Sequence, residues 1–426
     1  MKSLAITCAA ALTAAFLGTP ARAEPTQVTM WSNWPDEPAK KDWVAARVAD
    51  FNASSQQCAV KLTFMPKAEI FTQLKAVLRT GKGPDIFYME PDSPEFFDGG
   101  FLEPLDAYID QAGIEDWSRP AWTHGGKIYG IPAEAYTVEL YYNKDMVTKL
   151  GIEMPPSYQL TQSQFADLVK KAVAAGITPV AAGVGDRPYP GAFLTFESLL
   201  RKLGLEDYGK LVHGELAYND PRVIDVLTWM KGMIDAGAYP KSISTLKLGE
   251  AHFYFYSTPG AVTFPNPSWF TGRAFAAPEN GGMPANFPLG IMQYPAMDKG
   301  VCPDCKTLAV GGSFSLNSKS PHKECAGAML RSMATVENGT KWMEQVALQT
   351  GIKSDTSKIK SPHADYFVDL NARDKGAKYF FGVPLLYYRG KCADTYAQVM
   401  NSAFPAGLIG VKDAADKMDA ACLTKQ

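Results

Sequence analysis

Apolar residues recur with two different spacings along the first part of the chain. Short stretches that alternate apolar and polar side chains, or that are wholly apolar, predict strands at residues 27–31, 58–64 and 86–89. Apolar residues at helical spacing predict helices at residues 41–52 and 68–80. Strands and helices that follow one another in this order predict a sheet with parallel strands covered by helices.

The same alternation continues to the end of the chain. Further strands are predicted at residues 128–131, 137–142, 260–264, 289–294 and 308–316. Further helices are predicted at residues 161–175, 195–202, 221–236, 323–335, 337–349, 394–402 and 412–422. Pro and Gly gather at residues 258–290, an irregular stretch that could hold a site or a crossing between domains. The pattern indicates an α/β protein, and 426 residues suffice for two or three domains of about 150 residues each.

The first 23 residues have the three parts of a secretory signal peptide. Lys2 is followed by an apolar run at residues 4–17, and Ala-Arg-Ala at residues 21–23 forms the cleavage site before Glu24. The run is shorter than the roughly 20 residues that a membrane span needs. Cys8 raises the alternative of a lipoprotein signal, which is disfavoured because the apolar run continues beyond it. We therefore expect a protein exported to the periplasm.

Composition and charge exclude several classes of function. Hydrophobic residues make up 46% of the chain and aromatic residues 12%, and the formal net charge is −2. Without a basic excess, the chain is not expected to bind nucleic acid or anionic membrane surfaces. No G-x-S-x-G, H-E-x-x-H or P-loop motif is present, so we expect neither an enzyme nor a cofactor or metal. A secreted glycan hydrolase is the alternative, since its two carboxylates would not stand out among so many acids.

Six of the seven cysteines remain once the signal peptide, which holds Cys8, is removed. An even number in an oxidising compartment predicts up to three disulfides. One pair closes a short loop, one joins the two C-terminal helices, and the last is left by elimination. The expected pairs are Cys302–Cys305, Cys392–Cys422 and Cys58–Cys325. The first pair also has the C-x-x-C form of a redox or zinc motif, but it lies among turns and not at a strand-to-helix junction.

Several segments in a fixed order carry a family signal, and the stretch at residues 129–145 is the most specific of them. Residues 83–88 read Gly-Pro-Asp-Ile-Phe-Tyr, and residues 99–106 read Gly-Gly-Phe-Leu-Glu-Pro-Leu-Asp. Residues 126–132 read Gly-Lys-Ile-Tyr-Gly-Ile-Pro, and residues 140–145 read Leu-Tyr-Tyr-Asn-Lys-Asp. Weaker signals follow at residues 155–156, 260–263, 267–269, 311–314, 338–342 and 350–352. Over nearly all of the chain after the signal peptide, this order resembles the family 1 extracellular solute-binding proteins of ABC importers, which include maltose-binding protein.

The resemblance implies a periplasmic binding protein fold with two α/β lobes. Each lobe would hold a central mixed sheet flanked by helices, with a hinge where the chain crosses at residues 132–137 and 289–294. Lobe one is then expected at residues 24–133 plus 293–358, and lobe two at residues 134–292 plus 359–426. The implied function is that of the substrate-binding component of an ABC importer, a monomer that carries a sugar or oligosaccharide from the cleft to the membrane permease subunits.

A sugar site needs aromatic rings against C–H faces and polar groups, above all carboxylates, against hydroxyls. Ligands of such sheets bind beyond the carboxyl ends of strands. Trp34 and Asp36 follow the first predicted strand, whereas Trp31 is assigned to the core. Asp92 follows the third strand and resembles a ligand carboxylate of maltose-binding protein, although it could instead cap the next helix.

The crossing supplies two further candidates, Glu134 and Tyr136, which alternation places on one face of a strand. Tyr136 stands where maltose-binding protein has an acid, and this departure leaves the type of ligand open. In the second lobe, Tyr189 resembles a sugar-stacking position, and Arg187 could bridge hydroxyls or bind a carboxylate or phosphate.

The last candidates follow in the second half of the chain. Trp269 resembles another stacking position, and Tyr388 lies where the family often adds a late contact. Gly312 and Ser313 could present backbone N–H groups to the cleft, or could form a tight entry into a strand.

Three other ligand classes stay open on this fold. Acids with aromatic walls would suit a polyamine, Arg187 would suit a polyol phosphate, and paired tyrosines at residues 141–142 and 387–388 would suit ferric iron. The first tyrosine pair alternates across a strand, so its members face opposite ways. Trp34 and Trp269 favour a sugar, because an indole ring matches a pyranose face.

Overall fold

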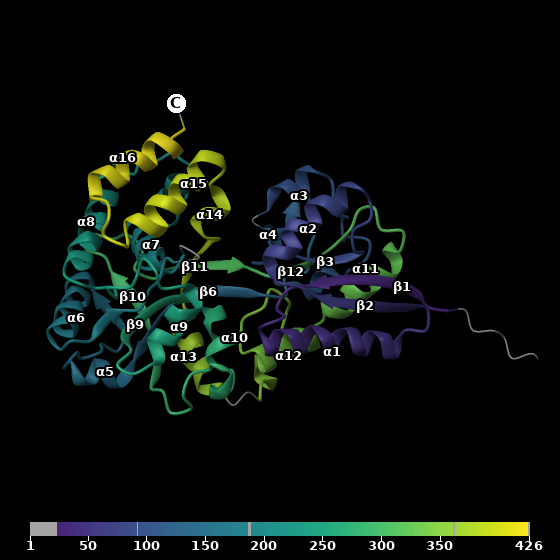
Figure 1. Cartoon of the computed structure of the whole chain (residues 1–426), viewed down its shortest axis with the longest axis horizontal. Coiled ribbons are helices and arrows are strands. Elements are labelled where there is room, and N and C mark those ends of the chain that lie inside the picture. Colours follow the sequence, from purple (N-terminus) through teal and green to yellow (C-terminus); the bar gives the residue numbers. More distant parts are fainter. Residues whose placement is uncertain (1–23, 92, 186–188, 361–362, 425–426) are drawn as a thin grey trace, which may run out of the picture.

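The computed structural model describes residues 24–91, 93–185, 189–360 and 363–424, which form two lobes (Figure 1). The expected signal peptide lies outside these residues, as do Asp92 and Arg187. Within the described part of the chain, none of the helices combines the length and the apolar character needed to span a bilayer.

The first lobe is built on a four-stranded sheet in the order β12-β3-β1-β2. Its strands are β1 (Thr26–Ser32), β2 (Cys58–Phe64), β3 (Ile86–Met89) and β12 (Ser313–Leu316). Strand β1 pairs in parallel with β2 and β3, and β12 pairs antiparallel with β3. The helices are α1 (Pro38–Ser54), α2 (Lys67–Arg79), α3 (Pro94–Asp98), α4 (Arg119–Trp122), α11 (Lys323–Met333) and α12 (Val336–Val346). Figure 1 shows α1 and α12 on one side of this sheet and α2 and α3 on the other.

The second lobe is built on a seven-stranded sheet, ordered β13-β11-β6-β10-β7 with β9 between β6 and β8. Its strands are β6 (Ala135–Asn143), β7 (Gln159–Thr161), β8 (Thr178–Val180), β9 (Ala261–Pro267), β10 (Leu289–Ala296), β11 (Cys305–Val310) and β13 (Lys378–Phe381). The helices are α5 (Lys144–Lys149), α6 (Gln162–Ala174), α7 (Tyr189–Val212), α8 (Pro221–Asp235), α9 (Leu248–Tyr256), α10 (Thr271–Ala274), α13 (Ala364–Asp374), α14 (Pro384–Tyr387), α15 (Gly390–Gln398) and α16 (Val411–Cys422). Each lobe thus has a mixed sheet flanked by helices, which confirms the fold class expected from the sequence.

Two neighbouring segments connect the sheets, one entering β6 and one joining β11 to β12 (Figure 1). They are hydrogen bonded to each other, since the N–H of Glu134 donates to the carbonyl of Gly312 at 2.8 Å and the N–H of Gly311 donates to the carbonyl of Glu134 at 2.9 Å. The chain crosses once more between α12 and α13. These paired segments form the base of the space between the lobes.

Some expected strand partners are wrong. The run at residues 308–316 is two strands, β11 and β12, which pair in different sheets on either side of Gly311 and Gly312. Residues 293–310, expected in the first lobe, pair within the seven-stranded sheet through β10 and β11. The strand predicted at residues 128–131 is shorter than expected, since it is the two-residue β5 (Lys127–Ile128), which pairs with β4 (Thr123–His124). Alternation identifies a strand but carries no information about its neighbour.

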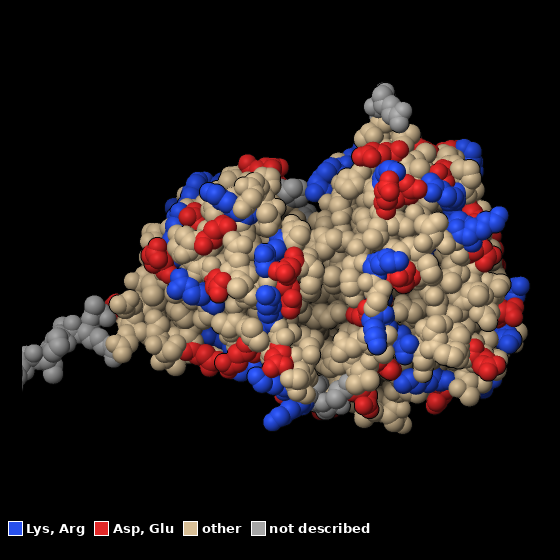
Figure 2. Space-filling view, turned by 180° about the vertical axis from the view of Figure 1, so that it is seen from behind, with Lys and Arg blue, Asp and Glu red and all other residues tan. Residues whose placement is uncertain are grey.

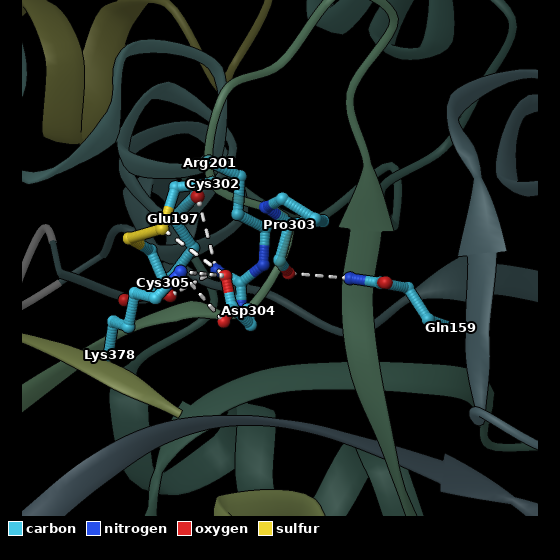
Figure 3. The surroundings of a disulfide bond; sticks show 8 residues. All are labelled: Gln159, Glu197, Arg201, Cys302, Pro303, Asp304, Cys305 and Lys378. Carbon is cyan, nitrogen blue, oxygen red and sulfur yellow. Dashed lines mark hydrogen bonds and ion pairs between the residues drawn. A yellow bond between two sulfur atoms is a disulfide. The ribbon is translucent and has the colours of Figure 1, made fainter. Parts of the chain in front are cut away.

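Three disulfides join the same cysteines that the sequence analysis expects, and each links segments within one lobe. The Cys302–Cys305 bond closes the turn before β11 (Figure 3). In that turn, the Gln159 amide donates to the carbonyl of Pro303 at 2.8 Å, and Lys378 pairs with Asp304 at 3.2 Å. The disulfide and these two contacts together connect the turn to β7 and β13.

Candidate functional site

A cavity of about 600 Å³ lies between the lobes. This volume is within the range of about 300–1,000 Å³ that is usual for small-molecule sites. Its lining comes from the loops after β1 and β3, from the crossing segments, and from α9, α10 and the 3₁₀ turn Ser268–Phe270 in the second lobe. One face of the molecule is hollowed between the lobes, with acidic and basic side chains on both sides of the hollow (Figure 2).

A buried lysine organises the first-lobe wall. The Nζ atom of Lys40 lies 2.7 Å from Oε2 of Glu37 and 2.6 Å from Oε2 of Glu134. Burial disfavours the charged ammonium, but Glu134 and Glu37 outweigh it and raise the pKa of Lys40. Burial also raises the pKa of Glu134, against the attraction of Lys40. This triad ties the start of α1 to the crossing segment at the base of the cavity.

A second ion pair stands beside the triad on the same wall. Glu90, in the loop after β3, pairs with Lys67 at the start of α2 and accepts a hydrogen bond from the hydroxyl of Tyr88 at 2.5 Å. The acids of this wall are therefore mostly engaged by neighbouring cations. Asp36 is exposed and has no ion pair with any described residue.

Trp34 reaches the cavity but belongs largely to the first-lobe core, since only 3% of it is exposed. Its ring packs edge-on against Tyr88, with centroids 5.2 Å apart, and lies 5.6 Å from that of Trp342. Gly312 is the reason the ring fits, because a Cβ atom there would lie 2.3 Å from the Trp34 ring. Trp34 has little free surface on which a sugar could stack.

Gly312 and Ser313 do not line the cavity. The carbonyl of Gly312 accepts from Glu134, and the hydroxyl of Ser313 is buried between the carbonyl of Gly311 and the indole N–H of Trp122. Their expected role in presenting N–H groups is corrected to the alternative, a tight entry into β12. Burial at the junction of two sheets uses these polar groups internally.

Tyr388, expected as a late ligand contact, does not line the cavity. It is buried in the core of the second lobe, where its hydroxyl lies 2.7 Å from that of Tyr218. Leu386, two residues earlier, lines the cavity instead. Tyr189 begins helix α7, and the same helix lines the cavity through Phe193.

Five of the expected residues line one cavity although they are far apart in the chain. They are Trp34, Asp36, Glu134, Tyr136 and Trp269. Trp269 is half-buried, and its ring stacks nearly parallel on that of His252, with centroids 5.6 Å apart and an angle of 15° between the planes. Trp269 itself lies in the irregular stretch at residues 258–290 that is rich in Pro and Gly.

Helix α9 supplies cavity residues that the sequence analysis missed. Phe253 is 43% exposed, and His252 is 2% exposed. Neither ring nitrogen of His252 has a hydrogen-bond partner among the described residues. The run His-Phe-Tyr-Phe-Tyr at residues 252–256 is an aromatic signal that could have indicated this wall, but helical spacing alone does not show which rings face a cavity.

Acid is expected to destabilise the folded chain partly through His252. Burial, with the charge of Arg273 adding to it, holds the pKa of His252 well below its usual 6.5. As the pH falls through 6.5, the His252 imidazole becomes protonated in the unfolded chain but stays neutral in the folded chain. The free energy of unfolding therefore decreases by up to about 1.4 kcal/mol per pH unit. In His252→Phe this part of the slope is expected to disappear. Urea unfolding of both proteins between pH 5 and pH 8 measures it, and identical slopes would contradict the assignment.

The chain matches the model of a protein family described as "Bacterial extracellular solute-binding protein" over residues 34–340. The maltotriose-binding protein of Pyrococcus abyssi is 33% identical over 94 residues, which is 21% of each of the two chains. The multiple sugar-binding protein of Streptococcus mutans is 21% identical over 329 residues, 74% of this chain and 73% of that relative. A solved structure from work on xylan utilization by Caldanaerobius polysaccharolyticus has a TM-score of 0.79 at 21% identity, covering 92% of this chain and 99% of that one. The structural likeness shows that the fold is shared.

Proposed function

Since the chain belongs to the family of bacterial extracellular solute-binding proteins, we propose that it captures a sugar or oligosaccharide between its lobes and delivers it to the permease subunits of an ABC importer. The chain would do this without catalysis and without a cofactor, as an exported monomer of the periplasm whose signal peptide is cleaved before Glu24. Relatives named for maltotriose and for multiple sugars support the choice of ligand class.

One observation carries the proposal, namely the aromatic surface on the second-lobe wall of the cavity. Trp269 and Phe253 both line the cavity and both keep exposed surface. Aromatic faces of this kind pack against the C–H face of a sugar ring, while the surrounding charged groups bond its hydroxyls. We place the first lobe around the four-stranded sheet and the second around the seven-stranded sheet, with the hinge at the paired crossing segments near Glu134 and Gly311.

The charges of the cavity argue against a polyamine. Acids and bases of the lining nearly balance, and Glu37, Glu90 and Glu134 are already engaged by lysines. A polyamine site would need several carboxylates free for its ammonium groups. Ferric iron is disfavoured as well, because Tyr141 and Tyr142 follow one another on β6 and pack into two different hydrophobic clusters.

A thermal-shift screen over saccharides, polyamines and metal ions tests the proposal with the whole exported chain. A ligand at 100 times its dissociation constant raises the free energy of unfolding by about 2.7 kcal/mol, which a melting curve resolves. Saccharides are expected to raise the melting temperature. Stabilisation by polyamines alone would overturn the sugar proposal, and steady turnover of an oligosaccharide would show a hydrolase instead.

Replacing the exposed tryptophan of the wall is expected to weaken sugar binding. Trp269→Ala removes the stacking face and should cost about 2–3 kcal/mol of binding free energy, or roughly a 30- to 150-fold rise in Kd. Isothermal titration with the best saccharide of the screen measures the change. The matched control is Trp229→Ala, a half-buried tryptophan of α8 outside the cavity, which should leave Kd unchanged. Equal Kd values for both variants would place the sugar elsewhere.

A further inference from the structure

We infer that the saccharide carries a carboxylate, as a uronate does, and that Arg273 binds this group beside His252. The inference rests on the proposed function and names the chemical class of its ligand. It combines a guanidinium and a buried imidazole on one wall of the cavity, neither of which has a hydrogen-bond or ion-pair partner among the described residues.

Arg273, in α10, is half-buried and lines the cavity, yet it forms no hydrogen bond or ion pair with any described residue. The cations of the opposite wall differ in this respect. Lys40 contacts two carboxylates and Lys67 contacts a third. The planar guanidinium offers two parallel N–H donors, which match the two oxygens of a carboxylate. A half-buried arginine without an acid of its own therefore leaves room for an acid that the ligand brings.

The surroundings of Arg273 add positive potential. Its Nη1 atom lies 2.5 Å from the position that a Cβ atom would take at Gly249, so the guanidinium rests on the first turn of α9. Helix N-termini favour anions, and Lys247 beside that turn also lines the cavity without an ion pair among the described residues. Glu250 is the acid of this turn, and its Oε2 accepts the backbone N–H of Lys247 at 2.8 Å. At this turn, the carboxylate of Glu250 is therefore outnumbered by two cations, Lys247 and Arg273, and by the positive end of α9.

His252 provides a second, independent observation that points to a polar ligand group beside Arg273. It is 2% exposed and lines the cavity, and neither of its ring nitrogens has a partner in the described part of the chain. A buried polar group left without a hydrogen bond is costly. A neutral imidazole offers one donor and one acceptor, which is the kind of group that a ligand hydroxyl satisfies. Trp269 stacks on His252 of α9, and Arg273 rests on the first turn of the same helix, so the three side chains belong to a single wall.

Isothermal titration of the whole chain with paired probes tests the inference. The probes are glucuronate, galacturonate and mannuronate oligosaccharides and their neutral counterparts of equal length. We expect a uronate probe to bind more tightly than its neutral counterpart. Arg273→Gln should weaken uronate binding about tenfold or more, the usual cost of losing a hydrogen-bonded charge partner, and should change neutral binding less than twofold.

Two further variants keep the result interpretable. Arg273→Lys retains the charge but loses the two-pronged geometry, so it should keep only part of the uronate preference. Arg79→Gln is the matched control, because Arg79 is an exposed arginine of α2 that has no ion pair with the residues that the structure describes and lies outside the cavity. It should bind like the parent chain, and the melting temperatures of all variants report folding.

The outcomes separate this inference from the proposed function. Tight uronate binding that Arg273→Gln abolishes supports the inference. Neutral saccharides that bind as well as uronates, or a uronate preference that survives in Arg273→Gln, would overturn it and leave the sugar proposal standing. If no saccharide binds and a polyamine does, both this inference and the proposed function are overturned.

Discussion

The double variant Cys58→Ala/Cys325→Ala is expected to lower the free energy of unfolding of the first lobe by about 5.5 kcal/mol. The disulfide joins the start of β2 to α11 across a sequence separation of 267 residues. A cross-link over so long a loop removes much of the conformational freedom of the unfolded chain, and both cysteines contact the hydrophobic core of this lobe. Urea unfolding of the oxidised parent and of the variant measures the difference.

The pair Cys302→Ala/Cys305→Ala is the control for this prediction. Its disulfide spans a sequence separation of only 3 residues, so the same relation gives about 2 kcal/mol. An equal or larger loss in this control would show that loop entropy does not explain the stabilisation. The third bond, Cys392–Cys422, with a separation of 30 residues, should fall between the two.

The second large effect is expected from the buried ion pair of α7. Glu197 and Arg201 have no exposed side-chain surface, and Oε2 of Glu197 lies 2.6 Å from Nη1 of Arg201 (Figure 3). The N–H of Thr307 donates to the other oxygen at 3.2 Å, which ties the pair to β11. Glu197→Leu would leave the guanidinium buried without its counter-charge, and we expect it to cost about 3–5 kcal/mol of unfolding free energy.

Two companions to Glu197→Leu separate charge from packing. In Glu197→Leu/Arg201→Met no uncompensated charge remains, so most of the stability should return. Glu206→Leu removes an exposed i,i+4 partner of Lys210 on the same helix and should cost no more than about 0.5 kcal/mol. If the double variant were as unstable as Glu197→Leu, the loss would come from packing and not from the buried charge.

Local patterns predicted most of the fold. Burial in β1 alternates as expected, with Val28 and Met30 inside, and α1 buries Trp43, Val48 and Phe51 along one stripe. The two-lobed α/β fold followed from the order of such elements and from the family resemblance. The exceptions are strands whose partners lie far away in the chain, such as β11, because the period of a strand is the same in either sheet.

The candidate site was predicted less completely, for reasons visible in individual residues. Trp34 and Trp269 both line the cavity, but Trp34 is buried among three aromatic neighbours whereas Trp269 keeps part of its surface exposed. Arg273 and His252 belong to no motif. Only the folded chain shows that neither side chain has a hydrogen-bond or ion-pair partner within the described residues. The sequence gives the chemical type of each side chain, but it does not show which hydrogen bonds and ion pairs that side chain already forms in the folded protein.

By itself, the sequence determined the α/β class, the family resemblance and five of the side chains that line the cavity, because these depend on local periodicity, residue type and order. The tertiary structure decided which sheet each strand joins and which polar groups remain unpaired at the cavity. Both depend on contacts between residues that are distant in the chain, as when Lys40 of α1 meets Glu134 of the crossing segment. Such contacts are selected by the packing of whole lobes, and no local spacing encodes them.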